Sequence, residues 1–320
     1  MNTETFVSIF RSYGWWDGVK SAVSALWYYI EKYALRRQYI CRNIFSSRMY
    51  LDARDPGISK TLAIFRKREL EHRYILSRVI KPGMVIWDLG ANIGYYALME
   101  ARLVGEQGKV YAIEPSPSNA ALLLRNINCN QLGGIVEVTE GAISSTNGVA
   151  SFYLSEMSNV HTFHPTSFRG EKKLAVKDVI EVKTFDVPTF LHGKRFVDLV
   201  RMDIEGHEVE VFGSIVNAID TTGFSAMILF ETHFAKYDDQ RHNMRQQLQA
   251  LFARGYVPRY LASTNESTAR FHERGHVPEC VIRTDNVLRG LYRDLPQDEA
   301  IEFICDIGGV RTVLLTKADA

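Results

Sequence analysis

Short apolar runs recur along this chain, and segments with apolar residues at helical spacing separate them. The first run, residues 84–87 (Met-Val-Ile-Trp), has the continuous apolar character of a strand buried on both faces. Later runs predict four more parallel strands, at 109–113, 135–138, 196–202 and 226–230. Helices are predicted between the strands, at 95–103, at 119–128 and after residue 204. Strands and helices in alternation predict an α/β fold with a doubly wound, mostly parallel sheet.

The last third of the chain is predicted to complete a seven-stranded sheet. A strand that starts at 255–257 is expected to pair with a terminal strand at 311–315. Residues 258–308 would then be an insertion between these two strands, with a helix at 298–305. Before them, residues 148–154 and 174–185 are expected to form an antiparallel pair of strands, joined by an irregular loop.

The N-terminal region differs in character from the rest. Residues 1–45 have apolar residues near helical spacing, with Gly14 as an interruption and Trp15 and Trp16 beside it. Two interpretations stay open: a helical arm that packs on the core or on a second subunit, and an amphipathic segment that contacts a membrane or a lipid-linked substrate. A charged helix is expected at 62–80, and its basic run 66–68 reads as a solvated face.

Composition narrows the class of protein. The chain has 320 residues, 46% of them hydrophobic, and a formal net charge of +1. This allows one large domain with an extension, and it gives no overall attraction to nucleic acid or anionic membrane. Four scattered cysteines form no Cys-x-x-Cys pair, so reduced thiols are expected. The longest apolar stretch near the N-terminus, residues 22–30, is shorter than the roughly 20 residues that a spanning helix needs. We therefore expect a soluble, cytoplasmic protein without a signal peptide.

The first predicted strand leads into a candidate ligand-binding turn. It ends at Asp88 and is followed by Gly90-Ala91-Asn92-Ile93-Gly94 and then by a helix. Glycines let a ligand approach the backbone, and the free N–H groups of the helix can face an anionic group. The next strand ends at Glu114, about where nucleotide-binding folds hold a ribose. Asn92 replaces the second glycine of a dinucleotide motif and no P-loop lysine follows, so S-adenosylmethionine, with a carboxylate tail in place of phosphates, fits best.

Four motifs in this order resemble the FkbM family of S-adenosylmethionine-dependent methyltransferases: DLGANIG, IEPSP, RMDIEGHEVEVF and ILFETH. The similarity is good over 74–233, fainter at 52–61 and near the C-terminus, and absent from the first forty residues. It implies a Rossmann-like class I methyltransferase domain over 80–320 with an N-terminal helical extension over 1–79. It also implies a cofactor site that comprises Asp88, Gly90, Ala91, Asn92, Gly94, Glu114, Ser116 and Ala142, with Glu69 or Glu71 as a further candidate.

Polar residues after the fourth and fifth strands are candidates for the reaction itself. Asp203 and Glu205 follow the fourth strand, and Glu231 and His233 follow the fifth. Because parallel strands end at one edge of a sheet, these groups are expected to converge. Asp203, Glu205 or His233 is the candidate general base, and a divalent metal such as Mg²⁺ between Asp203 and Glu231 is a second option.

Other polar residues nearby are expected to be structural. Glu208 and Glu210 are expected on a solvated helix face. His161 and His164 resemble a metal-binding pair, but no third ligand is near in sequence, so a mobile loop over the acceptor pocket is favoured.

The resulting hypothesis is an O-methyltransferase that acts on a hydroxyl of a sugar, glycolipid or related metabolite, the acceptor class being implied by the resemblance. Two alternatives stay open: a nicotinamide-dependent oxidoreductase, and a non-catalytic nucleotide-binding module of the same fold. The expected partner is a small-molecule or glycan acceptor and not nucleic acid, and assembly into a homo-oligomer is a further hypothesis.

Overall fold

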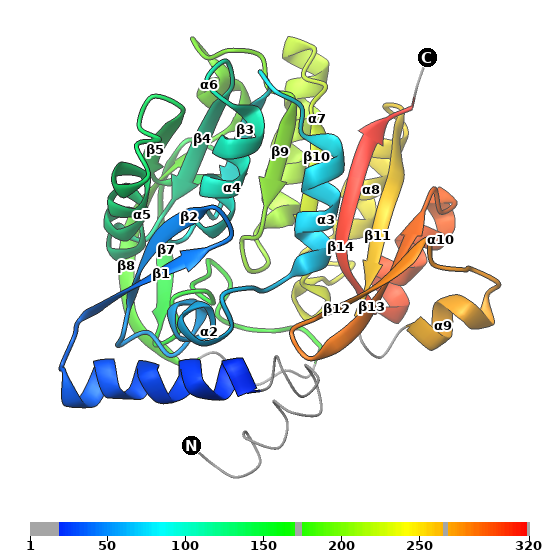
Figure 1. The fold of residues 1–320 in the computed structure, drawn as a ribbon. Helices are drawn as coiled ribbons and strands as arrows, with labels where there is room; N and C mark the ends of the chain where they lie inside the picture. Colours follow the sequence, from blue (N-terminus) through cyan, green and yellow to red (C-terminus); the bar gives the residue numbers. More distant parts are fainter. Residues whose placement is uncertain (1–18, 170–174, 265–267, 319–320) are drawn as a thin grey trace.

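A central mixed sheet organises the protein. The computed structural model describes residues 19–169, 175–264 and 268–318 (Figure 1). The sheet has nine strands in the order β12-β13-β11-β14-β10-β9-β3-β4-β5. Five of them are parallel: β3 (Val85–Leu89), β4 (Lys109–Glu114), β5 (Val136–Glu140), β9 (Leu199–Met202) and β10 (Met227–Glu231). The predicted fold class, a doubly wound α/β sheet, is confirmed.

The C-terminal half extends this sheet further than predicted. As expected, β11 (Tyr256–Ser263) pairs with the terminal strand β14 (Val310–Lys317), which lies antiparallel to β10. The predicted insertion contributes two additional strands, β12 (Cys280–Thr284) and β13 (Val287–Arg293), so seven strands was too few. Their two-residue turn has Asp285 and Asn286 at positive φ, which suits a tight hairpin.

Helices cover both faces of the sheet and make two cores. Apolar side chains of α4 (Tyr95–Val104) and α5 (Pro117–Cys129) pack with Ile86 of β3 on one face. On the other face, α7 (Glu208–Thr222) and α8 (Met244–Phe252) pack with Trp87. Successive residues of β3 therefore point into different cores, which explains the continuous apolar run in the sequence. The shorter helical elements are α6 (Val187–Leu191), η2 (Phe234–Lys236), α9 (Thr268–Glu273), α10 (Gln297–Glu302) and η3 (Phe303–Ile307).

The N-terminal extension is only partly helical. Residues 19–29 are helical and continue into η1 (Ile30–Ala34), but β1 (Tyr39–Ile44) and β2 (Ser47–Asp52) then form a hairpin. The prediction of helix up to residue 45 was therefore wrong, because burial alternates along β1 with a period of two. Gly14, Trp15 and Trp16 lie outside the described residues.

The predicted helix at 62–80 is two helices. These are α2 (Ile58–Phe65) and α3 (Leu70–Val79). Arg66 and Glu69 adopt positive φ between them, so the basic run is a connection and not a helix face. Part of the preceding helix remains exposed: Val23 and Leu26 are 62% and 63% accessible. Within the described residues, no helix has the length and apolar character needed to cross a bilayer. Contact of this region with a membrane or a second subunit stays a prediction.

A small second sheet supplies the segment that reaches the site. It consists of β6 (Ala142–Ile143), β7 (Gly148–Ser155) and β8 (Val176–Phe185), and β7 and β8 are antiparallel as predicted. After β7 the chain crosses toward the carboxyl edge of the central sheet. We call residues 156–169 the crossing loop.

Candidate functional site

The ends of β3 and β4 meet at one edge of the sheet. Leu89 and Ile113 are in register, so the glycine turn and Glu114 lie side by side. The Glu114 carboxylate is buried and accepts hydrogen bonds from the backbone N–H groups of Asn92 (2.8 Å) and Ser116 (2.9 Å). Burial raises the pKa of Glu114 to about 7, although these hydrogen bonds oppose the shift. The carboxylate is thus fixed in orientation and keeps lone pairs for further donors such as ribose hydroxyls.

The turn after β3 packs directly on the turn after β9. Gly90 has φ +74°, and a Cβ atom there would lie 2.3 Å from the carbonyl oxygen of Asp203. Gly94, with φ +93°, precedes α4, and a Cβ there would lie 2.7 Å from Leu123. Both glycines are therefore required by left-handed backbone and by close packing.

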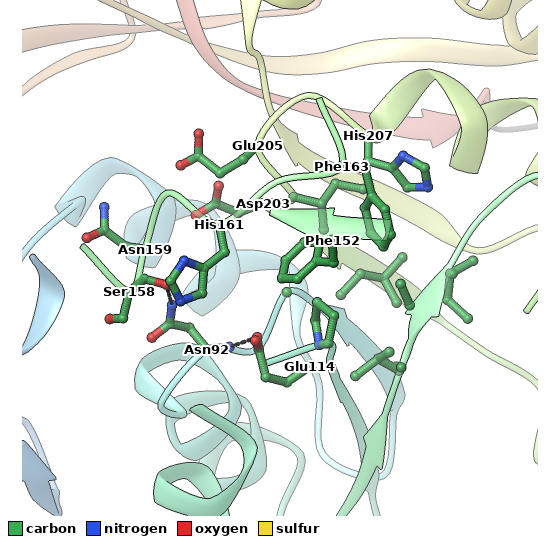
Figure 2. A pocket seen from close by; sticks show the side chains of 18 residues that line it. Asn92, Glu114, Phe152, Ser158, Asn159, His161, Phe163, Asp203, Glu205 and His207 are labelled. Atoms are coloured by element: carbon green, nitrogen blue, oxygen red, sulfur yellow. Dashed lines mark hydrogen bonds between the residues drawn. The ribbon is translucent and has the colours of Figure 1, made fainter. Parts of the chain in front are cut away.

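A pocket opens beside Glu114 (Figure 2). Four predicted cofactor residues line this Glu114 pocket: Gly90, Asn92, Glu114 and Ala142. Asp203 and Glu205 line it as well. The lining also includes the rings of Phe152, His161, Phe163 and His207. The loop that carries His161 and Phe163 was expected over the acceptor pocket, whereas no motif pointed to Phe152. The rings of Phe152 and Phe163 lie 4.7 Å apart between centroids and form an apolar wall that suits a flat heterocycle.

The crossing loop partly fills this pocket. The carbonyl oxygen of Ser158 accepts hydrogen bonds from the side chains of Asn92 (2.8 Å) and Asn119 (3.2 Å). The Ser158 backbone N–H and hydroxyl both donate to Asp55, at 3.1 and 3.0 Å. The remaining cavity measures only about 50 Å³. The loop is therefore closed over the pocket in this structure.

The other predicted cofactor residues lie outside the lining of this pocket. Asp88 is fully buried and pairs with Arg201 (3.0 Å), which also contacts Asp203 (3.3 Å). Ala91 donates its backbone N–H to Ile113 (3.1 Å). Ser116 acts through its backbone N–H on Glu114. The structure thus places Asp88 in an ion pair beneath the site.

The candidate catalytic residues converge on His233. Its Nδ1 lies 2.9 Å from Glu208, and its Nε2 lies 3.4 Å from Glu205, 3.7 Å from Glu231 and 3.9 Å from Asp203. The expectation that Glu208 lies on a solvated face was wrong, because Glu208 is fully buried against His233. Glu210 is half-buried among histidines and is not on a solvated face either.

Burial and charge set the protonation states in this cluster. Burial disfavours the imidazolium, but Glu208 and Glu205 raise the pKa of His233 well above its usual value. Burial raises the pKa of Glu205 to about 7, and the charge on His233 limits that shift. His233 is therefore cationic at neutral pH, whereas Glu205 is close to its midpoint and can exchange a proton.

A second, larger pocket adjoins the first. Its cavity measures about 650 Å³, and Glu205 lines both pockets. We call it the Arg311 pocket. Its lining includes four cationic side chains: Lys236, Arg270, Arg289 and Arg311. A mainly cationic wall on one side of Glu205 and an aromatic wall on the other divide the site into two chemically different halves.

One of the two predicted metal ligands, Glu231, already pairs with a cationic side chain. The potential ligand atoms of Asp203, Glu231 and His233 lie within 4.8 Å of one another. However, Arg311 contacts Glu231 at 2.5 Å and also pairs with Glu69 at 3.0 Å. A guanidinium therefore already neutralises Glu231 where a metal would, and this arrangement does not favour a cation there. Glu69 and Glu71, the further cofactor candidates, lie outside the Glu114 pocket; Glu71 faces Arg289 at 3.1 Å.

The chain is similar in sequence to several known proteins. A family model described as the methyltransferase FkbM domain matches residues 88–258, which is just over half of the chain. The hexuronic acid methyltransferase AglP of Haloferax volcanii is 27% identical over 176 residues, an alignment that covers 53% of this chain and 66% of AglP. The methyltransferase sdnD of Sordaria araneosa is 28% identical over 186 residues, with 50% of this chain and 71% of sdnD covered. The alignment thus covers slightly less than two thirds of AglP.

Similar solved structures include an S-adenosylmethionine-dependent O-methyltransferase from Thermotoga maritima. It is 14% identical, has a TM-score of 0.41, and covers 82% of this chain and 71% of its own.

Proposed function

Because the chain belongs to the FkbM methyltransferase family, we propose that it binds S-adenosylmethionine in the Glu114 pocket. The observation that carries this proposal is the buried Glu114 carboxylate, oriented by two backbone N–H groups beside the glycine turn. In this proposal the Glu114 carboxylate accepts hydrogen bonds from the ribose hydroxyls, and Phe152 and Phe163 contact the adenine. The backbone of the turn 90–94 lies against the rest of the cofactor.

The acceptor in this proposal occupies the Arg311 pocket and carries a negative charge. We propose a hydroxyl of a sugar or related metabolite that bears a carboxylate or another anionic group. Four basic side chains in the lining support an anionic ligand, and two of them, Arg289 and Arg311, also pair with buried glutamates. The name of one relative, the hexuronic acid methyltransferase AglP, is consistent with such a substrate.

Glu205 is the proposed general base, since it is the carboxylate that lines both pockets. When bound, the sulfonium would supply an electrophilic methyl carbon that an acceptor oxygen can attack in line, with the C–S bond breaking and the neutral thioether leaving. Glu205 takes the proton that the attacking hydroxyl loses. His233, held cationic by Glu208, stabilises the ionised form of Glu205 at 3.4 Å. A metal at Asp203 and Glu231 has no part in this mechanism, because Arg311 contacts Glu231.

The crossing loop has to move for this cofactor to enter. Small-molecule pockets usually measure about 300–1,000 Å³, and the closed Glu114 pocket leaves about 50 Å³. Residues 156–163 carry Ser158, His161 and Phe163 into the pocket. We propose that they shift outward on cofactor binding and then cover the ligand and exclude water.

Calorimetry tests the cofactor half of the proposal. S-adenosylmethionine is expected to bind to the full-length protein and NAD is not, which separates the methyltransferase from the alternative oxidoreductase. Glu114→Ala should abolish the binding heat. Glu137→Ala is the matched control, because Glu137 lies exposed on the neighbouring strand β5. Binding of NAD in place of S-adenosylmethionine, or unchanged binding in Glu114→Ala, would contradict the proposal.

Transfer of an isotope-labelled methyl group tests the acceptor half. The panel should pair each anionic sugar with its neutral analogue. Label on the anionic member of a pair is the expected result. Cofactor binding without transfer to any member would favour the non-catalytic module.

A further inference from the structure

Three segments that are distant in sequence meet around Glu210. Glu210 lies in the first turn of α7, His164 in the crossing loop, and His242 just before α8. Nε2 of His164 lies 3.5 Å from one Glu210 oxygen, and Nε2 of His242 lies 3.0 Å from the other. Potential ligand atoms of all three residues lie within 4.8 Å of one another. Tertiary contacts therefore bring two potential ligands to His164, whereas His161, the other member of the pair considered in the sequence, lines the Glu114 pocket.

The orientation of His242 is that of a metal ligand. Its Nδ1 lies 2.7 Å from the carbonyl oxygen of Lys236, which can only accept a hydrogen bond, so Nδ1 carries a proton. In the neutral ring, the lone pair of Nε2 then points at Glu210. Histidines that bind metals are held in this way, with the second nitrogen bonded to a carbonyl or carboxylate. A lone pair that faces a carboxylate at 3.0 Å needs a proton or a cation between them.

A fourth ring increases the need for positive charge. Nδ1 of His207 lies 3.1 Å from Nε2 of His164, and its Nε2 lies 3.0 Å from the hydroxyl of Ser144. Nδ1 of His207 also lies 3.5 Å from one Glu210 oxygen, and His207 is buried. Ring nitrogens and a carboxylate therefore crowd one point that is largely shielded from solvent.

We propose that His164, Glu210 and His242 bind one zinc ion, which fastens the crossing loop to α7. Imidazole nitrogen with carboxylate oxygen is a donor set that Zn²⁺ accepts. In a tetrahedral zinc site with bonds of about 2.0–2.1 Å, ligand atoms lie about 3.3 Å apart. Each Nε2 lies close to that distance from a different Glu210 oxygen, at 3.5 Å for His164 and 3.0 Å for His242, so small side-chain shifts would bring the three ligands onto one ion. His207 lies beside the ligands as a positioning residue.

The site is separate from the reaction centre but is connected to the pocket. His164 directly follows Phe163, which lines the Glu114 pocket. Zinc would fix this end of the crossing loop while residues 156–163 move. This consequence depends on the proposed function, whereas metal binding does not, so the two can fail separately.

Zinc binding to the full-length protein is the direct test. The purified protein is stripped with a chelator and titrated with Zn²⁺ in a calorimeter, and its metal content is measured by mass spectrometry. One equivalent is expected. Loss of an outer hydrogen-bond partner of a metal ligand typically costs 10–100-fold in affinity, so loss of a ligand in His164→Ala, Glu210→Ala or His242→Ala should cost about 100-fold or more. His272→Ala is the matched control, since this exposed histidine lies on α9.

A second measurement uses only the wild-type protein and therefore tests the proposal even where a variant fails to fold. Co²⁺ added to the stripped wild-type protein should give the visible absorption of a tetrahedral site, and Zn²⁺ should abolish it. Zn²⁺ should also raise the thermal midpoint of the stripped wild-type protein. Absence of stoichiometric Zn²⁺ uptake by the wild type would overturn the proposal, as would equal affinities of His164→Ala and His272→Ala. Protons would then be the partners of Glu210.

Discussion

At the scale of single residues, the proposed chemistry depends on where Glu205 lies. It follows β9, adopts φ +52° and borders both pockets. His233, Asp203, Glu208 and Arg311 are the charged groups that influence it. An acid group with a pKa of about 7 between the proposed cofactor pocket and the proposed acceptor pocket is suited to proton transfer near neutral pH.

Glu205→Gln should lower kcat by about 10²–10⁴-fold and leave the affinity for S-adenosylmethionine almost unchanged, because the amide keeps the shape and loses the base. For the wild type, Glu205 is protonated below a pKa of about 7, so kcat should fall as the pH drops through 7 and level off above it. Steady-state kinetics over a pH series measures both effects. The exposed Glu106→Gln serves as control, and an acidic limb that persists in Glu205→Gln would show that another group is the base.

Arg201 gives a prediction about stability. It is almost fully buried between Asp88 and Asp203, and its guanidinium lies 4.0 Å from the ring centre of Tyr96. Arg201→Met leaves Asp88 buried without its partner and should lower the free energy of unfolding by about 3 kcal/mol or more. Chemical denaturation measures this, with the exposed Arg241→Ala as control at less than about 0.5 kcal/mol. Equal stabilities would mean that Asp88 is neutral in the folded state.

The sequence motifs predicted which residues lie at the site better than they predicted which other residues these side chains contact. Glu114, Asn92 and Gly90, which were predicted as cofactor residues, line one pocket, and their contact with a cofactor stays a prediction. Asp88 was placed beside the cofactor, yet it pairs with Arg201, whose basic side chain was read as part of an apolar strand. A motif gives the position of a side chain along a strand, but the partner that it faces belongs to another strand.

At the scale of elements, the turn between β3 and α4 fixes the distance between the two halves of the site. Gly90 lies against the backbone carbonyl of Asp203, so the glycine turn packs closely on the turn after β9 that carries Asp203 and Glu205. The apolar run and the glycines predicted this strand, turn and helix. The contact with β9 could not be predicted, because 113 residues separate the two turns in sequence (203 minus 90).

Gly90→Ala should therefore destabilise the protein more than its backbone angle alone requires. Gly223 is a close control, because its φ of +73° nearly equals the +74° of Gly90 and a Cβ there would meet nothing within 4 Å. Gly223→Ala should cost about 1–2 kcal/mol, and Gly90→Ala clearly more, with loss of S-adenosylmethionine binding. Urea unfolding and calorimetry measure the two effects. Equal costs would show that the turn relaxes away from Asp203.

In the N-terminal extension, the secondary structure predicted from the sequence was partly wrong. Residues 39–44 were predicted as helix and form a strand, and residues 66–69 were predicted as helix and form an irregular connection. Both segments have few strong local signals. The buried Arg42 pairs with Glu31 and also donates to the carbonyl of Ala63 (3.2 Å), so contacts with other segments stabilise the hairpin.

At the scale of the whole molecule, charge is unevenly distributed although the chain is nearly neutral. The net charge of +1 gave no sign of an anionic ligand. Folding gathers Lys236, Arg270, Arg289 and Arg311 from η2, α9, β13 and β14 into one pocket. Overall charge predicts bulk behaviour, whereas a local field depends on which elements become neighbours.

Arg270→Gln tests this distribution. Arg270 is exposed at the Arg311 pocket, and its Nη1 donates to the carbonyl of Ile307 (3.0 Å), so its loss should leave the core intact. KM for an anionic acceptor should rise about 10-fold, in line with the roughly 1–3 kcal/mol of a charge-assisted hydrogen bond. KM for the neutral analogue of the same sugar, the matched control, should not change. Equal effects on both substrates would place the acceptor's charge elsewhere.

The sequence by itself determined the alternation of strands and helices, the glycine turn, Glu114 at the end of β4, and the set of polar residues after β9 and β10. These depend on local backbone preference and on periodic burial, which act over a few residues. Tertiary structure alone decided that Arg201 pairs with Asp88, that Arg311 forms an ion pair with Glu231, and that His164 and His242 both contact Glu210. Such pairings join segments tens to hundreds of residues apart, and their energies depend on burial and distance, which exist only after the chain has folded.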